Sequence, residues 1–206
     1  MKKILILFIA VLLLSLVSCN KEDNDNVDYA EPPEYELTEL SDAVDLPEYK
    51  ELTVTQNTGE GRGDAVWRVV LEGSKIIEYP ESFLSYYQSQ TTSKYKHMAK
   101  EAGLTYAELL EALGLTEEDV KNEAKTLAAA ELIAMAIIEK EQITLTDDEI
   151  ARLFSRYAEK IAEELGKDVS YVKENLADDV YDTMLHDKMI EFLITQNTFI
   201  TENEND

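Results

Sequence analysis

The residues that could carry acid–base or metal chemistry are two histidines, His97 and His186, in a chain of 206 residues. Asp182 and Asp187 lie close to His186 in the sequence, so an acid–base pair or part of a metal site is conceivable there. A zinc site needs three or four ligands, mostly cysteine and histidine, and the chain has one cysteine besides its two histidines. We therefore expect no metal and no cofactor. We interpret both histidines as ordinary residues on helix surfaces.

Nucleophilic and phosphate-binding motifs do not occur in the sequence. A serine nucleophile needs a histidine base and an orienting acid, but there is no G-x-S-x-G motif and the serines near the histidines fall in predicted helices. Neither a P-loop nor a G-x-G-x-x-G loop is present, and the glycine-rich residues 60–63 are too short to replace one. The run Asp147-Asp148-Glu149 could attract a cation, but the first turn of a helix explains it better. We expect no catalytic residue and no enzyme activity.

The one cysteine, Cys19, lies in a recognisable pattern. Lys2 and Lys3 precede an apolar run at residues 4–14, which is shorter than the roughly 20 residues of a membrane-spanning helix. Leu16-Val17-Ser18-Cys19 then resembles the lipobox of bacterial lipoproteins. This resemblance implies that residues 1–18 are a removed signal peptide and that a lipid on Cys19 anchors the protein to the extracytoplasmic face of the cell membrane. The alternative is an ordinary secretory signal peptide with an incidental cysteine.

The net charge of the chain limits the kinds of partner that its surface can bind. There are 43 acidic and 19 basic residues, a formal net charge of −24. Binding to nucleic acid or to anionic lipid through the protein surface needs a basic patch, so we expect neither. A strongly negative surface suits a protein that resists self-association.

One long helix, expected at residues 116–143, organises the rest of the chain. Thr116 can cap its start, and acidic residues crowd its first turn, where the helix dipole favours them. Its middle, residues 127–138, carries a single charge, Glu131. An amphipathic surface helix has one apolar stripe, whereas this stretch is apolar over most of its girth. We expect it to be packed from several sides.

The remaining pattern predicts an all-α, multi-helix domain. Capping boxes at Thr105 with Glu108 and at Thr146 with Glu149 mark two helix starts, and glycines or prolines mark the ends. We expect helices at residues 64–79, 81–102, 105–113 and 146–165, a short one through Tyr171 and Leu176, and a last one at 178–196. Residues 66–71 are rich in β-branched residues, so a strand is the alternative there.

Around this helical part we expect less regular segments. Acidic, proline-bearing residues 19–36 cannot bury enough apolar surface to order themselves and would form a disordered tether. Residues 37–63 would be an extended segment, with a short strand near residues 52–55 and a flexible linker at 56–63. The helical domain would then span residues 64–200, followed by a disordered tail at 201–206.

Methionine and tyrosine side chains offer a candidate binding surface. Methionine adapts to varied apolar partners, and tyrosine combines apolar area with a polar tip. Taken singly, each of these residues is best explained as core, but a small bundle cannot cover all of them. The uncovered part would be an apolar patch of the kind that binds polypeptides. The candidate substrate-binding residues are Tyr87, Tyr95, Met98, Tyr181, Met184, Met189 and Phe192.

The helical pattern resembles a known family. The long helix ending in Ala136-Ile137-Ile138-Glu139, the cap Thr146-Asp147-Asp148-Glu149 and the last helix through residues 187–193 are similar to the C-terminal domain of trigger factor. More loosely they resemble the helical domain of SurA-type periplasmic chaperones. The resemblance covers residues 46–195. It implies a helical chaperone domain that binds unfolded or newly exported polypeptides without ATP.

Two departures from the trigger factor pattern matter for function. Trigger factor carries an FKBP-type prolyl isomerase domain where only residues 56–63 stand here, and its ribosome-docking loop has no counterpart in the sequence. The resemblance therefore implies the chaperone cradle without the isomerase or the ribosome site. Two alternatives remain open at this point. One is a lipoprotein module that docks a single envelope or secretion partner, and the other is a foldase related to peptidyl-prolyl isomerases.

Overall fold

The computed structural model describes residues 42–201. Cys19, the expected signal peptide, the expected tether at 19–36 and most of the expected tail lie outside the described residues. The described part contains seven helices and four short strands, so the all-α prediction is confirmed. Within residues 42–201 no helix is long and apolar enough to cross a membrane.

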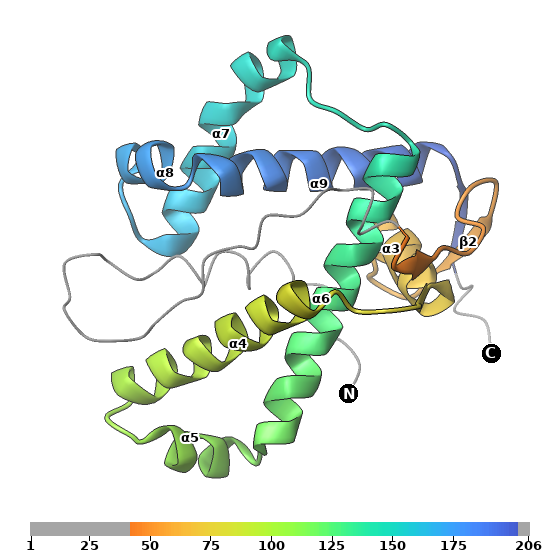
Figure 1. Ribbon diagram of the computed structural model, residues 1–206. Coiled ribbons are helices and arrows are strands. Elements are labelled where there is room, and N and C mark those ends of the chain that lie inside the picture. Colours follow the sequence, from red (N-terminus) through yellow and green to blue (C-terminus); the bar gives the residue numbers. More distant parts are fainter. Residues whose placement is uncertain (1–41, 202–206) are drawn as a thin grey trace.

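The helix α6, Glu117–Lys140, is the spine of the fold (Figure 1). Thr116 caps it as predicted, because its hydroxyl accepts the Asp119 N–H at 3.2 Å while the Asp119 carboxylate accepts the Thr116 N–H at 2.7 Å. Three acidic residues in the first turn match the positive end of the helix dipole. Leu132 and Ile137 in its second half are fully buried, which confirms that this part is packed from several sides.

A first arm forms along the first half of α6. Helix α4, Glu81–Glu101, packs along α6, and α5, Tyr106–Leu113, joins them at the tip. The predicted Thr105 capping box starts α5, and Gly114 ends it with a φ of 68°, a left-handed conformation that glycine adopts without strain. The arm has a small core of its own, which consists of Tyr95, Ala99, Leu109, Leu110 and Val120.

A second arm consists of α7, α8 and the first half of α9. Helix α7, Asp147–Leu165, starts at the predicted Thr146 capping box and ends at Gly166, α8 spans Val169–Asn175, and α9 spans Ala177–Thr195. This arm also has a separate core, built from Ala158, Ile161, Ala162, Val172, Leu176, Val180 and Met184. Figure 1 shows both arms leaving α6 on the same side, one near each end of the spine.

A compact body covers the other side of the spine. It contains α3, Arg62–Gly73, together with the second halves of α6 and α9. The predicted helix at residues 66–71 is therefore confirmed over the alternative strand, but the helix ends at Gly73 and does not continue to residue 79 as expected. Short β1, Val44–Asp45, pairs antiparallel with β3, Lys75–Ile76.

The C-terminal strand differs from the sequence-based expectation. Strand β2, Thr53–Gln56, was predicted, but its partner β4, Thr198–Thr201, was not: residues 198–200 were placed after the last helix at the end of the helical domain, and residue 201 in the disordered tail. The two strands are parallel and lie 145 positions apart in the chain, so no local pattern points to their pairing. Asn197 fixes the pairing, because its side chain accepts the Leu52 N–H at 2.8 Å and donates to the Tyr49 carbonyl at 2.9 Å.

The expected flexible linker at residues 56–63 is a defined turn. Glu60 accepts a hydrogen bond from the Arg68 Nε at 2.8 Å, and the same guanidinium donates to the Thr55 carbonyl at 2.9 Å. The Gln56 amide donates to the Glu60 carbonyl at 2.9 Å. Arg68 comes from α3, beyond the glycine-rich stretch, and ties the turn to the body. The glycine-rich residues 56–63 predicted a flexible linker because Arg68, which holds the turn in place, lies outside that stretch of sequence.

Burial of the spine should dominate stability. Truncation of Leu132 to alanine leaves a cavity in the body core, and we expect the free energy of unfolding to fall by about 2–5 kcal/mol. Leu113→Ala is the matched control, since that leucine is exposed at the tip of the first arm, and we expect a change within about 0.5 kcal/mol. Urea unfolding followed by circular dichroism measures both, and equal losses would contradict the assignment of α6 as the spine.

Candidate functional site

Four of the seven predicted binding residues are core residues. Tyr87, Tyr95, Met184 and Met189 are all buried. Burial raises the pKa of Tyr95, and its hydroxyl raises it further by donating to the Glu123 carboxylate at 2.6 Å, a bond that links α4 to α6. The prediction of a contact surface at these four positions does not hold in this conformation. The core alternative applies to them: Tyr87 and Met189 belong to the body core, Tyr95 to the core of the first arm and Met184 to that of the second.

Two predicted residues remain accessible, one on each arm. Met98 lies near the end of α4 and is 37% exposed, and Tyr181 near the start of α9 is 36% exposed. The Tyr181 ring stacks against Phe154 of α7 with 5.1 Å between ring centroids, so one of its faces is held in place. Phe192 is half-buried against the body core.

The tip of the first arm adds two exposed leucines that were not predicted. Leu104 and Leu113 flank the ends of α4 and α5 and are accessible to solvent. Leu104 follows Gly103 and Leu113 precedes Gly114, so both sit beside a helix-ending glycine. This position could have predicted their exposure, because an apolar residue at the end of a helix lies outside the periodic apolar stripe that the helix buries. Met98 and these leucines make the tip the most apolar exposed part of this arm.

Carboxylates gather where α4, α6 and α9 meet. Glu131 is half-buried on α6, and burial raises its pKa to about 7, with a further contribution from Asp182 of α9. Asp182 keeps solvent contact, but the surrounding protein and then Asp179 and Asp178 raise its pKa to about 6. Burial also raises the pKa of Tyr86 on α4, with Asp179 adding to the effect.

His186 is a correction to the sequence interpretation. It was expected on a helix surface, but it lies largely buried between α9 and α3, edge-on to Trp67 with 5.7 Å between ring centroids. Its Nε2 and the Trp67 Nε1 have no hydrogen-bond partner among the described residues. Burial lowers the pKa of His186, and neighbouring Asp187 opposes that shift. His97 is partly exposed on α4, with its Nε2 3.3 Å from Glu101.

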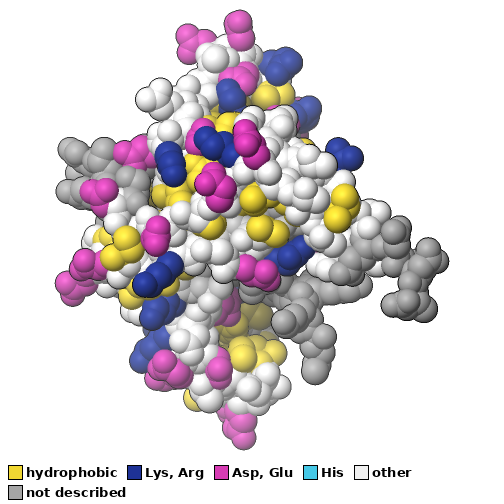
Figure 2. All heavy atoms as spheres, turned by 90° about the vertical axis from the view of Figure 1, so that its right-hand side faces the viewer, with side chains coloured by type: hydrophobic (Ala, Val, Ile, Leu, Met, Phe, Trp, Pro, Cys, Tyr) yellow, Lys and Arg dark blue, Asp and Glu magenta, His cyan; other side chains and the backbone are white. Residues whose placement is uncertain are grey.

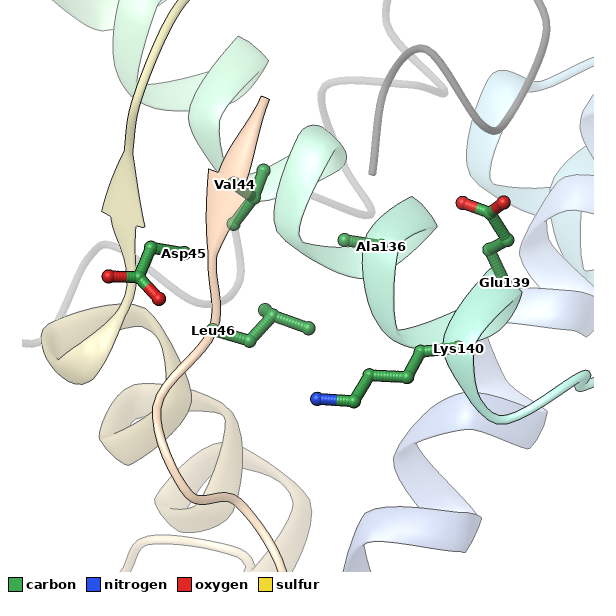
Figure 3. Close-up of a pocket in the computed structure, with 6 residues that line it drawn as sticks. All are labelled: Val44, Asp45, Leu46, Ala136, Glu139 and Lys140. Carbon is green, nitrogen blue, oxygen red and sulfur yellow. The ribbon is translucent and has the colours of Figure 1, made fainter. Parts of the chain in front are cut away.

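A cavity of about 460 Å³ lies between β1 and the end of α6 (Figure 3). Figure 3 shows Leu46 and Ala136 turned toward each other across it, with the Lys140 side chain reaching toward the strand. The Lys140 ammonium sits 5.3 Å from the Tyr49 ring centroid. This lining offers one cation and the carboxylates of Asp45 and Glu139, but no nucleophile with a base, so we assign it no chemistry.

A second cavity of about 320 Å³ lies between α7 and α9. In its lining the Lys188 ammonium lies 2.7 Å from Glu149 and donates to the Thr144 carbonyl at 2.6 Å. The Lys188 hydrogen bond and the Thr146 cap lower the pKa of Glu149 to about 2. The Asp147-Asp148-Glu149 run thus serves as a helix cap, as predicted. Within residues 42–201 no group of three or more acidic, histidine or cysteine side chains could hold a metal ion.

The outer face of the body is broken into small patches. Figure 2 shows yellow apolar side chains separated by acidic and basic ones over this face. Ile77 and Ile200 are the large exposed apolar residues of the body. The apolar residues of the arms are therefore not simply part of a generally apolar surface.

Comparison with known proteins places this architecture in a family. The family described as bacterial trigger factor protein (TF) C-terminus matches residues 55–195, which is the helical part including both arms. The chain belongs to this family. The trigger factor of Caldicellulosiruptor saccharolyticus is 25% identical over 197 residues, which is 81% of this chain and 42% of that protein.

The similarity to trigger factor covers only part of that protein and ends at particular residues of this chain. The chain spans about two fifths of the length of the relative from Caldicellulosiruptor. The family match begins inside β2 and ends at the last residue of α9, so β4 lies just beyond it. Between β2 and α3 the described chain has only the short turn held by Arg68. No solved structure gives a significant match.

The buried histidine should make stability fall at acid pH. An unfolded histidine has a pKa of about 6.5, and His186 has a lowered pKa when folded. As the pH falls through about 6.5, the unfolded state takes up a proton that the folded state refuses, and stability is lost. His186→Phe keeps the ring against Trp67 and removes this proton, so we expect the variant to gain stability relative to the parent at pH 5 compared with pH 8. Urea unfolding at both pH values measures the difference, and an equal difference at each would contradict the burial of His186.

Proposed function

We propose that the protein is a membrane-anchored, extracytoplasmic chaperone that holds unfolded polypeptides between its two arms without ATP. One observation carries this proposal. The two arms have separate small cores, leave the same side of one spine, and each present exposed apolar side chains. Membership of the trigger factor C-terminus family supports it.

Binding would come from burial of apolar area on both sides of a client segment. Met98, Leu104 and Leu113 serve on the first arm and Tyr181 on the second. These side chains are partly exposed, so each gains only a fraction of the roughly 1.5–3 kcal/mol of a fully buried one. The contacts are few and carry no directional hydrogen bonds. The chaperone would therefore bind many clients weakly and release them without an energy source.

The anchor and the location rest on the sequence around Cys19. The charged start, the short apolar run and Leu16-Val17-Ser18-Cys19 support export and lipid attachment. A lipid on Cys19 would keep the arms at the membrane surface, where exported chains emerge unfolded. The net charge of −24 would keep a chaperone with exposed apolar arms from associating with itself.

The test is suppression of aggregation by a soluble form that starts at residue 20. At about equimolar ratio it should slow the aggregation of several unfolded clients, measured by light scattering. The variant Met98→Ser with Tyr181→Ser removes one contact from each arm. Since 1.4 kcal/mol is tenfold in affinity, we expect about tenfold more of this variant to be needed.

The matched control is Ile77→Ser with Ile200→Ser. These two residues are 64% and 50% exposed on the body, so the control removes at least as much exposed apolar surface. We expect it to match the parent. Equal loss in both variants would show nonspecific hydrophobic binding, and no suppression by the parent would refute the chaperone proposal.

A further inference from the structure

The cavity between α7 and α9 has two sides of opposite charge. Arg152 and Arg156 line it from α7, and Asp187 and Glu191 line it from α9. The members of each pair are four residues apart on a helix, so they lie on one face of it. Between the two charged sides the lining is apolar and consists of Leu145, Leu153 and Met184.

The carboxylates of this cavity have partners within the second arm. Glu149 pairs with the Lys188 ammonium at 2.7 Å, and Asp187 accepts a hydrogen bond from the Tyr157 hydroxyl at 2.8 Å. Glu191 has no ion pair among the described residues. The α9 side of the cavity therefore keeps its negative charge.

The two arginines have no carboxylate partner within the described part of the chain. Both side chains are exposed, and the Arg156 guanidinium lies 5.6 Å from the centroid of the Tyr157 ring. The chain has 43 acidic and 19 basic residues, so carboxylates are abundant, but those across the cavity do not pair with these arginines. Arg152 and Arg156 are thus free to bind an acidic segment from outside the described chain.

The residues before the described chain carry the complementary charge. Residues 20–41 include eight acidic residues and one lysine, and Glu34-Tyr35-Glu36 places an aromatic ring between two carboxylates. In an extended segment, residues two apart point to the same side and lie about 7 Å apart. Positions one turn apart on a helix are about 5–6 Å apart. Glu34 and Glu36 therefore match the spacing of the two arginines, while Tyr35 points to the opposite side.

The acidic segment is long enough to reach the cavity. The described chain begins close to Val44, which lines the first cavity together with Lys140 of α6. Leu145 of the second cavity follows Lys140 by only five positions, which span at most about 18 Å. Residues 36–42 can span about 20 Å when extended. Pro32 and Pro33 favour an extended chain just before Glu34.

We propose that residues 34–36 dock into the cavity between α7 and α9, with Glu34 and Glu36 on Arg152 and Arg156 and the Tyr35 ring on the apolar lining. The segment lacks the apolar residues to order itself alone and becomes ordered on binding. Docking ties the second arm to the chain that precedes the body, and only residues 20–33 then remain between Cys19 and the folded part. It needs neither a lipid nor a client, so it stands or falls independently of the proposed chaperone function.

The test is the distance between residue 30 and α7 in the soluble form that starts at residue 20. This form keeps the whole described chain and has no cysteine of its own. Spin labels at Ala30→Cys and at exposed Ala151→Cys report the distance by pulsed electron paramagnetic resonance. We expect one short, defined distance at low salt and a broad distribution at 1 M salt, where charges are screened beyond about 3 Å. A broad distribution at low salt would overturn the proposal.

Variants of the cavity test which cations hold the segment. In Arg152→Gln with Arg156→Gln we expect the ratio of docked to undocked protein to fall about tenfold, as two surface ion pairs are lost. The control Lys160→Gln with Lys173→Gln removes two exposed cations from α7 and α8 that do not line the cavity, and it should behave as the parent. Equal release in both variants, or in neither, would contradict docking at this cavity.

Variants of the segment repeat the test without changing the described fold. We expect Glu34→Gln with Glu36→Gln to release the segment about tenfold, again through the loss of two ion pairs. Asp23→Asn with Asp25→Asn removes the same charge at the same spacing and should leave it docked. Equal release by both pairs would show a general attraction of the acidic chain and would overturn the assignment of residues 34–36.

Two further samples examine other occupants of the cavity. A mixture of protein labelled only at residue 30 with protein labelled only at residue 151 should give no defined distance, and a defined one would mean docking into a second copy. Moving the first label from Ala30 to Asn205 should give a broad distribution. A defined distance from Asn205 would assign the cavity to the acidic C-terminal residues. Either of these defined distances would overturn the proposal.

Discussion

Burial of α6 along most of its length is the constraint on which the rest of the structure depends. Helix α4, helix α9 and strand β1 all pack against this one helix. Ala124 and Ala128 are completely buried, and such small side chains let α4 approach closely along the seam. Since a helix apolar on several sides must be covered on several sides, the spine recruits elements from both ends of the chain. Both arms take their direction from it.

The same requirement explains where the fold is under electrostatic stress. A charge in a helix covered on several sides either finds a partner or shifts its pKa. The pKa of Glu131 is raised, first by burial and then by Asp182 of α9, because no cation among the described residues lies opposite it to stabilise its charge. The chain has few basic residues, and several of them pair with other carboxylates, as Lys188 does with Glu149 and Arg68 with Glu60. The excess of negative charge in the sequence thus reaches into the partly buried middle of α6.

The helices could be predicted from the sequence because their signals are local. A capping threonine with an acidic residue three positions later starts a helix at Thr105, Thr116 and Thr146, and the structure has all three boxes. Strand β4 could not be found in this way, because its partner β2 lies at the other end of the described chain, and their register depends on the Asn197 side chain and on backbone bonds such as Thr198 N–H to the Leu52 carbonyl.

The candidate site was predictable only in part, for a related reason. Periodicity shows that Tyr87, Met184 and Met98 lie on apolar faces, but it does not show which faces a third helix covers. Tyr87 and Met184 are covered and Met98 is not, because α4 extends past the spine's core toward the tip of its arm. The burial of His186 followed from the position of Trp67 on α3, 119 positions away. The exposure of Leu113 could have been predicted from the sequence, because this leucine lies at the end of a helix next to Gly114.

Site-specific photo-crosslinking tests the central claim most directly, namely that clients lie between the arms. A photoreactive amino acid is placed in turn at Met98, Tyr181, Ile77 and Ile200 and irradiated with an unfolded client present. The account predicts strong crosslinks from Met98 and Tyr181, to overlapping segments of one client molecule, and weak ones from the two body positions. Crosslinks of equal yield from all four positions, or from the body alone, would contradict it.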